Sequence, residues 1–358
     1  MRKRHGKTNR TAYRKMTHNQ RKWITGIFGA SALLAVILLI PLFLVNRFEE
    51  WNASQILPLR PQETLQSAPG SESLIVPVFL SGKEEVANIP IEEYVRGVLA
   101  AEMPAEFEHE ALKAQAIAAR TYIVRRLADG DRSSMPPEAG AAVVTDTVLH
   151  QAYLSEQDLR EQWGFFAYAR NMDKLTRAVN ETQGLILTYE GKPIHATFFS
   201  TSNGYTEDSE KYWSEPLPYL RSVKSQWDKI YSPKYKSTTR ISRKEVFQRL
   251  GLSEAKGNLN LKVLEKSPSG RVLKIEVGGR TFTGREFREK LGLPSTDFGW
   301  TVKGQSLEFT TLGFGHGVGM SQWGANGLAK QGKDAKEILQ YYYTGVDIVP
   351  LKDVLPKV

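Results

Sequence analysis

The chain of 358 residues is longer than one small domain needs, and its 41% hydrophobic and 24% charged residues are typical of a globular protein with additional segments. Residues 1–23 hold nine Lys or Arg and no acidic residue, which equals the whole formal net charge of +9. The remaining 39 basic residues balance the 39 acidic ones, so the high pI of the chain comes from its N-terminal tail alone. We therefore predict no nucleic-acid binding by the folded part. Cysteine is absent, which excludes a disulfide framework, a thiolate metal site and a cysteine nucleophile.

The N-terminal part of the chain has the pattern of a membrane anchor. Residues 24–46 contain no charged side chain and are long enough to span a bilayer. A cleaved signal peptide ends in small residues, whereas this stretch ends in the bulky segment Phe43–Val45, so we predict an uncleaved single-pass transmembrane helix rather than a buried core helix. The positive-inside rule then predicts that residues 1–23 form a cytoplasmic tail and that residues 48–358 lie outside the cell membrane.

The residues after the anchor divide into a linker and a folded region. Residues 52–72 are polar, contain prolines and show no periodicity, so we assign residues 47–73 to an extracytoplasmic linker. One catalytic domain is predicted over residues 74–350. It begins with a strand at residues 74–80.

A helix that ends at Pro104 carries the first candidate for chemistry. Apolar residues recur with the spacing of a helix that has one buried face, at Ile91, Tyr94, Val95, Val98 and Leu99. Glu102 is the next position on that face, and Pro104, two residues later, ends the helix. A poorly solvated carboxyl near the negative end of the helix dipole is favoured in its protonated form, so Glu102 is a candidate proton donor. The alternative is a solvated glutamate at a helix end.

The next predicted helix covers residues 108–127. Lys113 and Arg120 are seven residues apart and share a face with Ile117 and Val124, and that face could look onto Glu102. The alternative is that both cations lie at the surface with their aliphatic stems packed along it.

Shorter elements follow in chain order. We predict a bent strand at 143–153, helices at 156–163 and 173–181, a hairpin of strands 185–189 and 194–199, a helix at 242–250 that opens with a capping box of Ser242 and Glu245, a hairpin of strands 261–264 and 272–277, a helix at 285–291, and a strand at 307–311. These elements predict an α+β fold, in which mixed helices and antiparallel strands form a groove.

Polar residues gather where the strand at 194–199 ends. Ser200, Ser202 and Asn203 lie in the run from residue 200 to 205, which ends in a glycine and a tyrosine. Side chains of this kind at a strand end are candidate substrate contacts. The alternative is an ordinary capped turn.

A glycine-rich loop follows the strand at 307–311. It runs from Gly313 to Ala325, contains His316, and leads into a helix that Ser321 and Gln322 open. The glycines let the backbone adopt conformations closed to other residues and approach a ligand closely. Neither the Walker pattern nor the dinucleotide spacing is present, and the serine-hydrolase elbow is matched only in part.

Three blocks of the sequence resemble the stage II sporulation protein D family. They are residues 101–104 with 110–122, residues 199–205, and residues 315–325, and the resemblance extends from about Leu74 to Tyr343. It implies a peptidoglycan lytic transglycosylase that cleaves the MurNAc–GlcNAc bond, leaves 1,6-anhydro-muramyl ends, and acts in septal wall degradation during forespore engulfment. In this comparison the catalytic acid corresponds to Glu102.

The resemblance carries further expectations about the site and its partners. Lys113, Arg120, His316, Ser321 and Gln322 match other motif positions of the family and are expected near the acid, where they would bind the substrate. The amidase stage II sporulation protein P and the membrane protein stage II sporulation protein M are expected partners. Some relatives hold a zinc ion with Cys and His, but this chain lacks Cys, and its histidines at 109, 150 and 195 lack ligand spacing, so we expect no metal or other cofactor.

A second function remains open from the sequence. Related domains are regarded as enhancers of cell-wall amidases, so the chain could be a non-catalytic glycan-binding module. Glu102 is present in either case, and detection of 1,6-anhydro products would separate the two.

Overall fold

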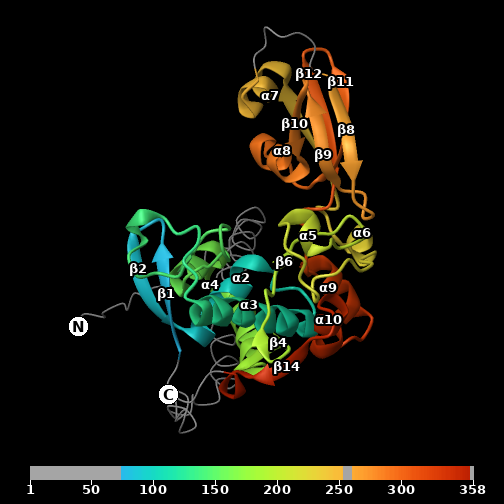
Figure 1. The fold of residues 1–358 in the computed structure, drawn as a ribbon. Helices are drawn as coiled ribbons and strands as arrows, with labels where there is room; N and C mark the ends of the chain where they lie inside the picture. The colour runs from blue at the N-terminus through green and yellow to red at the C-terminus, as the bar shows by residue number, and fades with distance from the viewer. Residues whose placement is uncertain (1–73, 253–259, 355–358) are drawn as a thin grey trace, which may run out of the picture. The chain divides into compact units, whose positions relative to one another are not determined.

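The computed structural model describes residues 74–252 and 260–354 (Figure 1). The predicted tail, transmembrane helix and linker lie outside these residues. Within the two described ranges, no helix combines the length and the apolar character needed to cross a membrane.

The predicted α+β class is confirmed by the order of the elements. The helices are α2 (Ile91–Glu102), α3 (His109–Asp129), α4 (Glu156–Glu181), α5 (Ser209–Tyr212), α6 (Trp227–Tyr231), α7 (Arg243–Leu250), α8 (Gly284–Leu291), α9 (Gln322–Lys330) and α10 (Ala335–Tyr342), with short 3₁₀ turns at Pro137–Ala139 and Leu351–Asp353. The strands are β1 (Ile75–Leu80), β2 (Glu85–Pro90), β3 (Val144–Thr145), β4 (Leu185–Tyr189), β5 (Lys192–Pro193), β6 (Phe198–Phe199), β7 (Lys236–Ser242), β8 (Leu261–Lys266), β9 (Val272–Val277), β10 (Arg280–Thr283), β11 (Asp297–Lys303), β12 (Ser306–Leu312), β13 (Met320–Ser321) and β14 (Asp347–Pro350).

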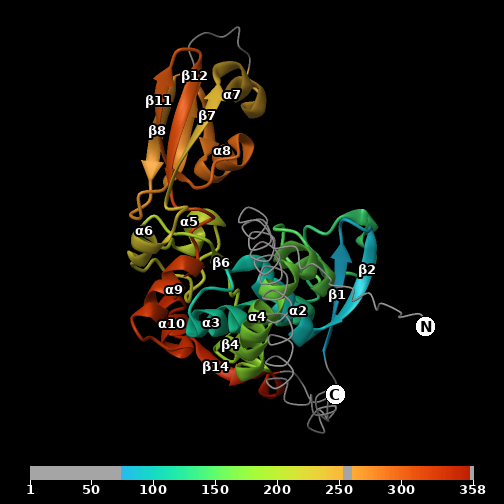
Figure 2. The same cartoon turned by 180° about the vertical axis from the view of Figure 1, so that it is seen from behind.

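The described residues build two large hydrophobic cores and a small third cluster around Phe79. The first surrounds α2 and α3 and includes the small sheets β2-β1-β3 and β14-β4-β5, with α9 and α10 packed on α3. The second lies within residues 241–309, where the antiparallel sheets β10-β9-β8 and β11-β12-β7 pack with α7 and α8. Figures 1 and 2 show this second group of elements together. The segment that forms the second core is inserted between two parts of the chain that both belong to the first core. After β12 the chain returns to the first core at β13.

The helix pair forms where the sequence predicts it. Helix α2 ends at Glu102, and Met103 is extended, with φ −125° and ψ 139°, as expected for a residue that precedes a proline. Helix α3 runs antiparallel to α2, so its Arg120 reaches Glu92 in the first turn of α2. Small side chains along α3, such as Ala114, Ala116, Ala118 and Ala119, are fully buried and allow close packing.

Three predicted elements differ from the observed ones. The bent strand at 143–153 pairs only at Val144–Thr145. After Asp146, whose N–H still bonds to Phe79 of β1, the backbone bonds within the loop and to Gly97 of α2. The helices at 156–163 and 173–181 are the two ends of α4, which is kinked at Gly164, with φ 67° and ψ 171°. The strand at 194–199 pairs at its end, Phe198–Phe199, while its start joins β4 through one backbone bond, from the Ile194 N–H to the Leu187 carbonyl.

Gly97 fixes the loop that follows β3 onto α2. The carbonyl of Gly97 accepts a bond from the Leu154 N–H at 3.4 Å, and a Cβ at position 97 would overlap the ring of Tyr153 and the carbonyl oxygen of Leu154. Tyr153 stacks on Tyr94 with ring centroids 5.6 Å apart, and the Tyr94 hydroxyl donates to Gln151 Oε1. The loop is therefore held against α2 on both sides of residue 152.

We predict that Gly97→Ala destabilises the protein although alanine is the better helix former. The collision is with a backbone oxygen and a packed ring, and overpacking of this kind costs about 1–3 kcal/mol. Gly82→Ala is the matched control, because a Cβ there meets nothing within 4 Å. Urea unfolding of the two variants should give a lower free energy of unfolding for Gly97→Ala alone; equal stabilities would show that the loop yields freely.

Candidate active site

The carboxyl group of Glu102 lies where three segments meet. Its Oε1 accepts a hydrogen bond from the Ala152 N–H at 3.0 Å, in the loop that Gly97 holds. Its Oε2 accepts a bond from Gln322 Nε2 at 3.2 Å, in the first turn of α9. The side chain is half-buried at the end of α2. Residues 102, 152 and 322 are thus brought together from distant parts of the chain.

Burial dominates the electrostatics of Glu102. It raises the pKa of the carboxyl, while the bonds from Ala152 and Gln322 favour the ionised form and oppose that rise. Neither partner is a cation or a second carboxylate. The net effect is a raised pKa, so Glu102 keeps a proton to higher pH than an exposed glutamate does.

Gln322 is placed by the cap of α9. Ser321 is the N-cap residue, and its Oγ accepts from the Gly324 N–H, as the sequence predicts for the start of this helix. The same hydroxyl donates to Asp228 Oδ1 at 2.5 Å. Ser321 is fully buried, so its observed role is to position Gln322.

Asp228 is a residue of this region that the sequence did not indicate. It is fully buried, and besides Ser321 it accepts bonds from the Ser202 N–H at 2.8 Å and the Ser225 hydroxyl at 2.6 Å. It therefore ties the polar run after β6 to the start of α9. A single aspartate in an aperiodic stretch carries no sequence signal for such a role.

The polar run after β6 is mostly engaged in internal bonds. Ser202 is fully buried and donates to the Ser225 carbonyl, and the Asn203 amide donates to Asp297 Oδ2 and to the Ser269 carbonyl, both at 2.8 Å. Asn203 thereby links the two cores. Ser200 is half-buried beside Thr201, with Oγ atoms 3.3 Å apart. This geometry favours the structural interpretation of the run over direct substrate contact.

The expectation that Lys113 and Arg120 face Glu102 is wrong. Arg120 is fully buried, and its guanidinium donates to both carboxylate oxygens of Glu92 and to the Leu185 carbonyl. Ten residues separate Glu92 from Glu102 along α2, which is about 15 Å. Lys113 pairs with Glu110 at 2.9 Å. The orientation of α3 about its axis differs from the expected one. Because α3 is buried on nearly all sides, the spacing of its apolar residues does not determine which side faces α2.

His316 lies among aromatic rings. Its ring centroid is 5.6 Å from Phe199, 5.8 Å from Tyr212 and 5.1 Å from Trp213, and its Nδ1 accepts from the Val318 N–H. Burial lowers the pKa of His316 to about 3, so the imidazole is neutral at neutral pH. None of its contacts is with Glu102, and the link from this loop to Glu102 runs through Gln322.

The glycines of this loop allow its backbone to pack closely against other segments of the protein. Gly317 has φ 90°, and a Cβ there would lie 2.6 Å from Nε of Arg271. Gly319 has φ 81°, and its Cβ would overlap the Thr197 carbonyl. The close approach that the sequence suggested for a ligand is thus made to Arg271 and to the segment before β6.

The histidines at positions 109 and 150 make contacts with protein side chains. His109 contacts Glu181, and His150 contacts Thr145. Within residues 74–252 and 260–354, no three side chains of His, Cys, Asp or Glu gather where they could hold a metal ion. The described residues therefore offer no arrangement that fits the zinc ion considered in the sequence analysis.

Comparisons with known proteins identify the class. A family model described as stage II sporulation protein matches residues 81–189. Stage II sporulation protein D of Bacillus amyloliquefaciens is 46% identical over 340 residues, which cover 92% of this chain and 97% of that protein. The Bacillus subtilis protein of the same name is 46% identical over 326 residues, covering 89% and 94%. An amidase enhancer of B. subtilis is 28% identical over 307 residues, 71% of this chain and 40% of the enhancer.

The chain is therefore a sporulation protein of α+β fold. It belongs to the stage II sporulation protein D family, as the three sequence blocks indicate.

We predict that Arg120→Ala is far more destabilising than Lys113→Ala. Loss of Arg120 removes the guanidinium from the Leu185 carbonyl and from the Glu92 carboxylate, which retains only its bond from the Gly184 N–H among the described contacts. Breaking a buried pair of this kind costs about 3–5 kcal/mol. Lys113 belongs to a partly exposed pair, worth about 0–1 kcal/mol. Denaturant unfolding of both variants tests this, and comparable losses would contradict the assignment of Arg120 to the core.

We also predict a pH-dependent stability difference for Glu102→Gln. Because the folded pKa of Glu102 is raised, ionisation of this group opposes folding, and the native protein loses stability as pH rises from the unfolded pKa through the folded one. Glutamine has no such loss. Melting temperatures of the variant minus those of the native protein should therefore increase from pH 4 to pH 7. A constant or decreasing difference would show that the carboxyl is stabilised as the anion.

Proposed function

We propose that the chain is a peptidoglycan lytic transglycosylase that cleaves the MurNAc–GlcNAc glycosidic bond and leaves 1,6-anhydro-muramyl ends. The observation that carries this proposal is the Glu102 carboxyl, half-buried, with a raised pKa, and bonded by an N–H group and a side-chain amide. Membership in the stage II sporulation protein D family supports the choice of substrate.

One carboxyl group can perform this reaction. Glycosidases that use water commonly employ two carboxylates, but in a lytic transglycosylase the C6 hydroxyl of the muramyl residue is the nucleophile. Protonated Glu102 donates its proton to the glycosidic oxygen as the bond from C1 to that oxygen breaks. The C6 oxygen then bonds to C1, and the Glu102 carboxylate accepts the proton of that hydroxyl. Glu102 is protonated again at the end, and no water is consumed.

The two partners of Glu102 fit both protonation states. After proton donation, the Ala152 N–H and the Gln322 amide N–H stabilise the carboxylate. Before donation, rotation of the Gln322 amide by half a turn presents its Oε1 to the carboxyl proton. Burial raises the pKa of Glu102, which favours the protonated form that a general acid needs, while the two donors oppose that rise.

The second candidate is a glycan-binding module that enhances a cell-wall amidase. The 28% identity to a B. subtilis protein named amidase enhancer favours it. Such a module would bind glycan strands without forming anhydro ends, so analysis of the products separates the two functions.

We predict that Glu102→Gln removes catalysis and preserves folding. General acid–base catalysis contributes about 10² to 10⁴ in rate, so anhydro product should fall by at least about 100-fold. Glu106→Gln is the matched control, because Glu106 is exposed and lies only four residues away. Mass spectrometry of digests of purified peptidoglycan measures both variants. Normal turnover by Glu102→Gln, or loss in Glu106→Gln, would assign the acid to another residue.

The cellular setting extends the proposal. We propose a single-pass membrane protein with its catalytic region outside the membrane, acting on the septal wall during engulfment. The charge pattern of residues 1–46 and the family resemblance support this setting. Association with stage II sporulation proteins P and M stays a prediction.

A further inference from the structure

Two cavities lie beside Trp213. One, of about 260 Å³, is lined by residues of α3 such as Tyr122 and Arg125 together with Thr197. The other, of about 430 Å³, is lined by residues around α5 and by residues of the second core such as Arg271. Trp213 lines both, and Glu102 lines neither.

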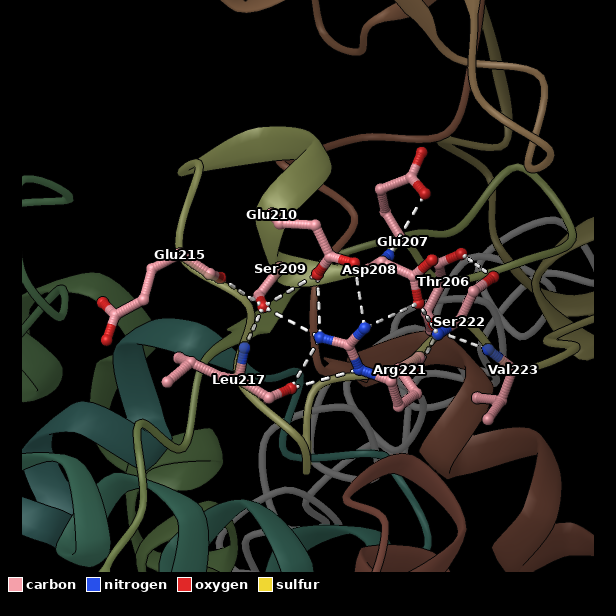
Figure 3. Close-up of polar contacts among 10 residues, drawn as sticks. All are labelled: Thr206, Glu207, Asp208, Ser209, Glu210, Glu215, Leu217, Arg221, Ser222 and Val223. Atoms are coloured by element: carbon pink, nitrogen blue, oxygen red, sulfur yellow. Dashed lines mark hydrogen bonds and ion pairs between the residues drawn. The ribbon is translucent and has the colours of Figure 1, made fainter.

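A polar network around Arg221 holds α5, the helix that directly precedes Trp213 (Figure 3). The Arg221 guanidinium forms a two-pronged pair with Glu210, at 2.9 Å and 2.8 Å, and also donates to the Leu217 carbonyl at 2.7 Å. These bonds fix α5, and the Trp213 N–H donates to the Ser209 carbonyl at its end. Because the backbone at Trp213 is already fixed, less conformational entropy is lost when a ligand packs on its ring.

The glycine-rich loop supports this ring from one side. His316 lies 5.1 Å from Trp213, and Tyr212 meets Trp213 edge-on at 5.2 Å. The His316 imidazole is neutral because of its burial, so it presents no charge to the indole. The outer part of Trp213 remains half-exposed between the two cavities. Flat apolar rings of this kind pack against the C–H faces of sugars.

The charges of the larger cavity leave an excess of cations. Its three carboxylates are engaged: Glu207 by the hydroxyls of Ser267 and Ser269, Glu210 by Arg221, and Glu265 by Lys274. Lys211 makes no ion pair with any described residue. Arg271 is fully buried and donates to a serine hydroxyl and to the Tyr205 carbonyl, with no carboxylate in direct contact within the described ranges. A carboxylate entering this cavity would meet an unpaired ammonium group.

We propose that Trp213 and Lys211 form a glycan subsite, separate from Glu102, that binds an N-acetylmuramyl residue by ring stacking and by its lactyl carboxylate. The inference rests on the proposed function for the identity of the glycan. The volume of the larger cavity suits one or two sugar rings, and the second cavity provides a continuation of the strand on the other side of Trp213.

The test measures binding without turnover, using the full-length chain that carries Glu102→Gln. The probes are peptide-free octasaccharides of alternating N-acetylglucosamine and N-acetylmuramic acid, and N-acetylated chito-octasaccharide, which has no carboxylate. Trp213→Ala should weaken both affinities by about tenfold or more, as expected of a central aromatic contact, and Trp213→Phe should lose less. Phe166→Ala is the control, since Phe166 is 87% exposed and lines neither cavity.

Lys211→Gln should remove the preference for the muramyl octasaccharide and leave the affinity for the chito-octasaccharide unchanged. Unchanged affinity in a Trp213→Ala variant with a native melting temperature would overturn the subsite, and so would an undiminished muramyl preference in Lys211→Gln. The proposed function is tested separately, by anhydro product from the native chain. Anhydro product with normal Trp213→Ala binding refutes only the subsite. Weakened binding without any anhydro product refutes only the lytic activity.

Discussion

The partial desolvation of one carboxyl group is the constraint on which the site depends. Glu102 belongs to a helix whose other inward positions are apolar, and its charge is disfavoured where it lies. Two donors compensate for part of that cost, and each needs a support of its own. The Ala152 N–H is held because Gly97 admits its loop, and the Gln322 amide is held because Ser321 caps α9 and bonds to buried Asp228.

The same construction explains why so much of the motif sequence is structural. Gly317 and Gly319 let the loop pack on Arg271 and Thr197, Ser321 is buried, and Arg120 neutralises Glu92. Few of these residues are free to touch a substrate. They bring the start of α9 against the end of α2, and they place His316 against Trp213, so one loop organises both the Glu102 site and the proposed Trp213 subsite.

The sequence predicted the local features well and the long-range ones poorly. Helix α2, its end before Pro104, and the inward phase of Glu102 followed from apolar spacing and proline sterics, and the start of α9 followed from its cap. The face of α3 could not be predicted, since a helix buried all round has no apolar stripe to orient it. Asp228, Trp213 and the second core were missed because their roles arise from contacts between segments far apart in the chain, which leave no periodic signal.

The central claim is that one carboxyl group suffices because the substrate supplies its own nucleophile. The most direct measurement is digestion of purified peptidoglycan glycan strands in water enriched in oxygen-18, followed by mass spectrometry of the new muramyl ends. Attack by the C6 hydroxyl predicts 1,6-anhydro ends that carry no oxygen-18. Reducing muramyl ends labelled with oxygen-18 would show that water is the nucleophile, and would contradict the account.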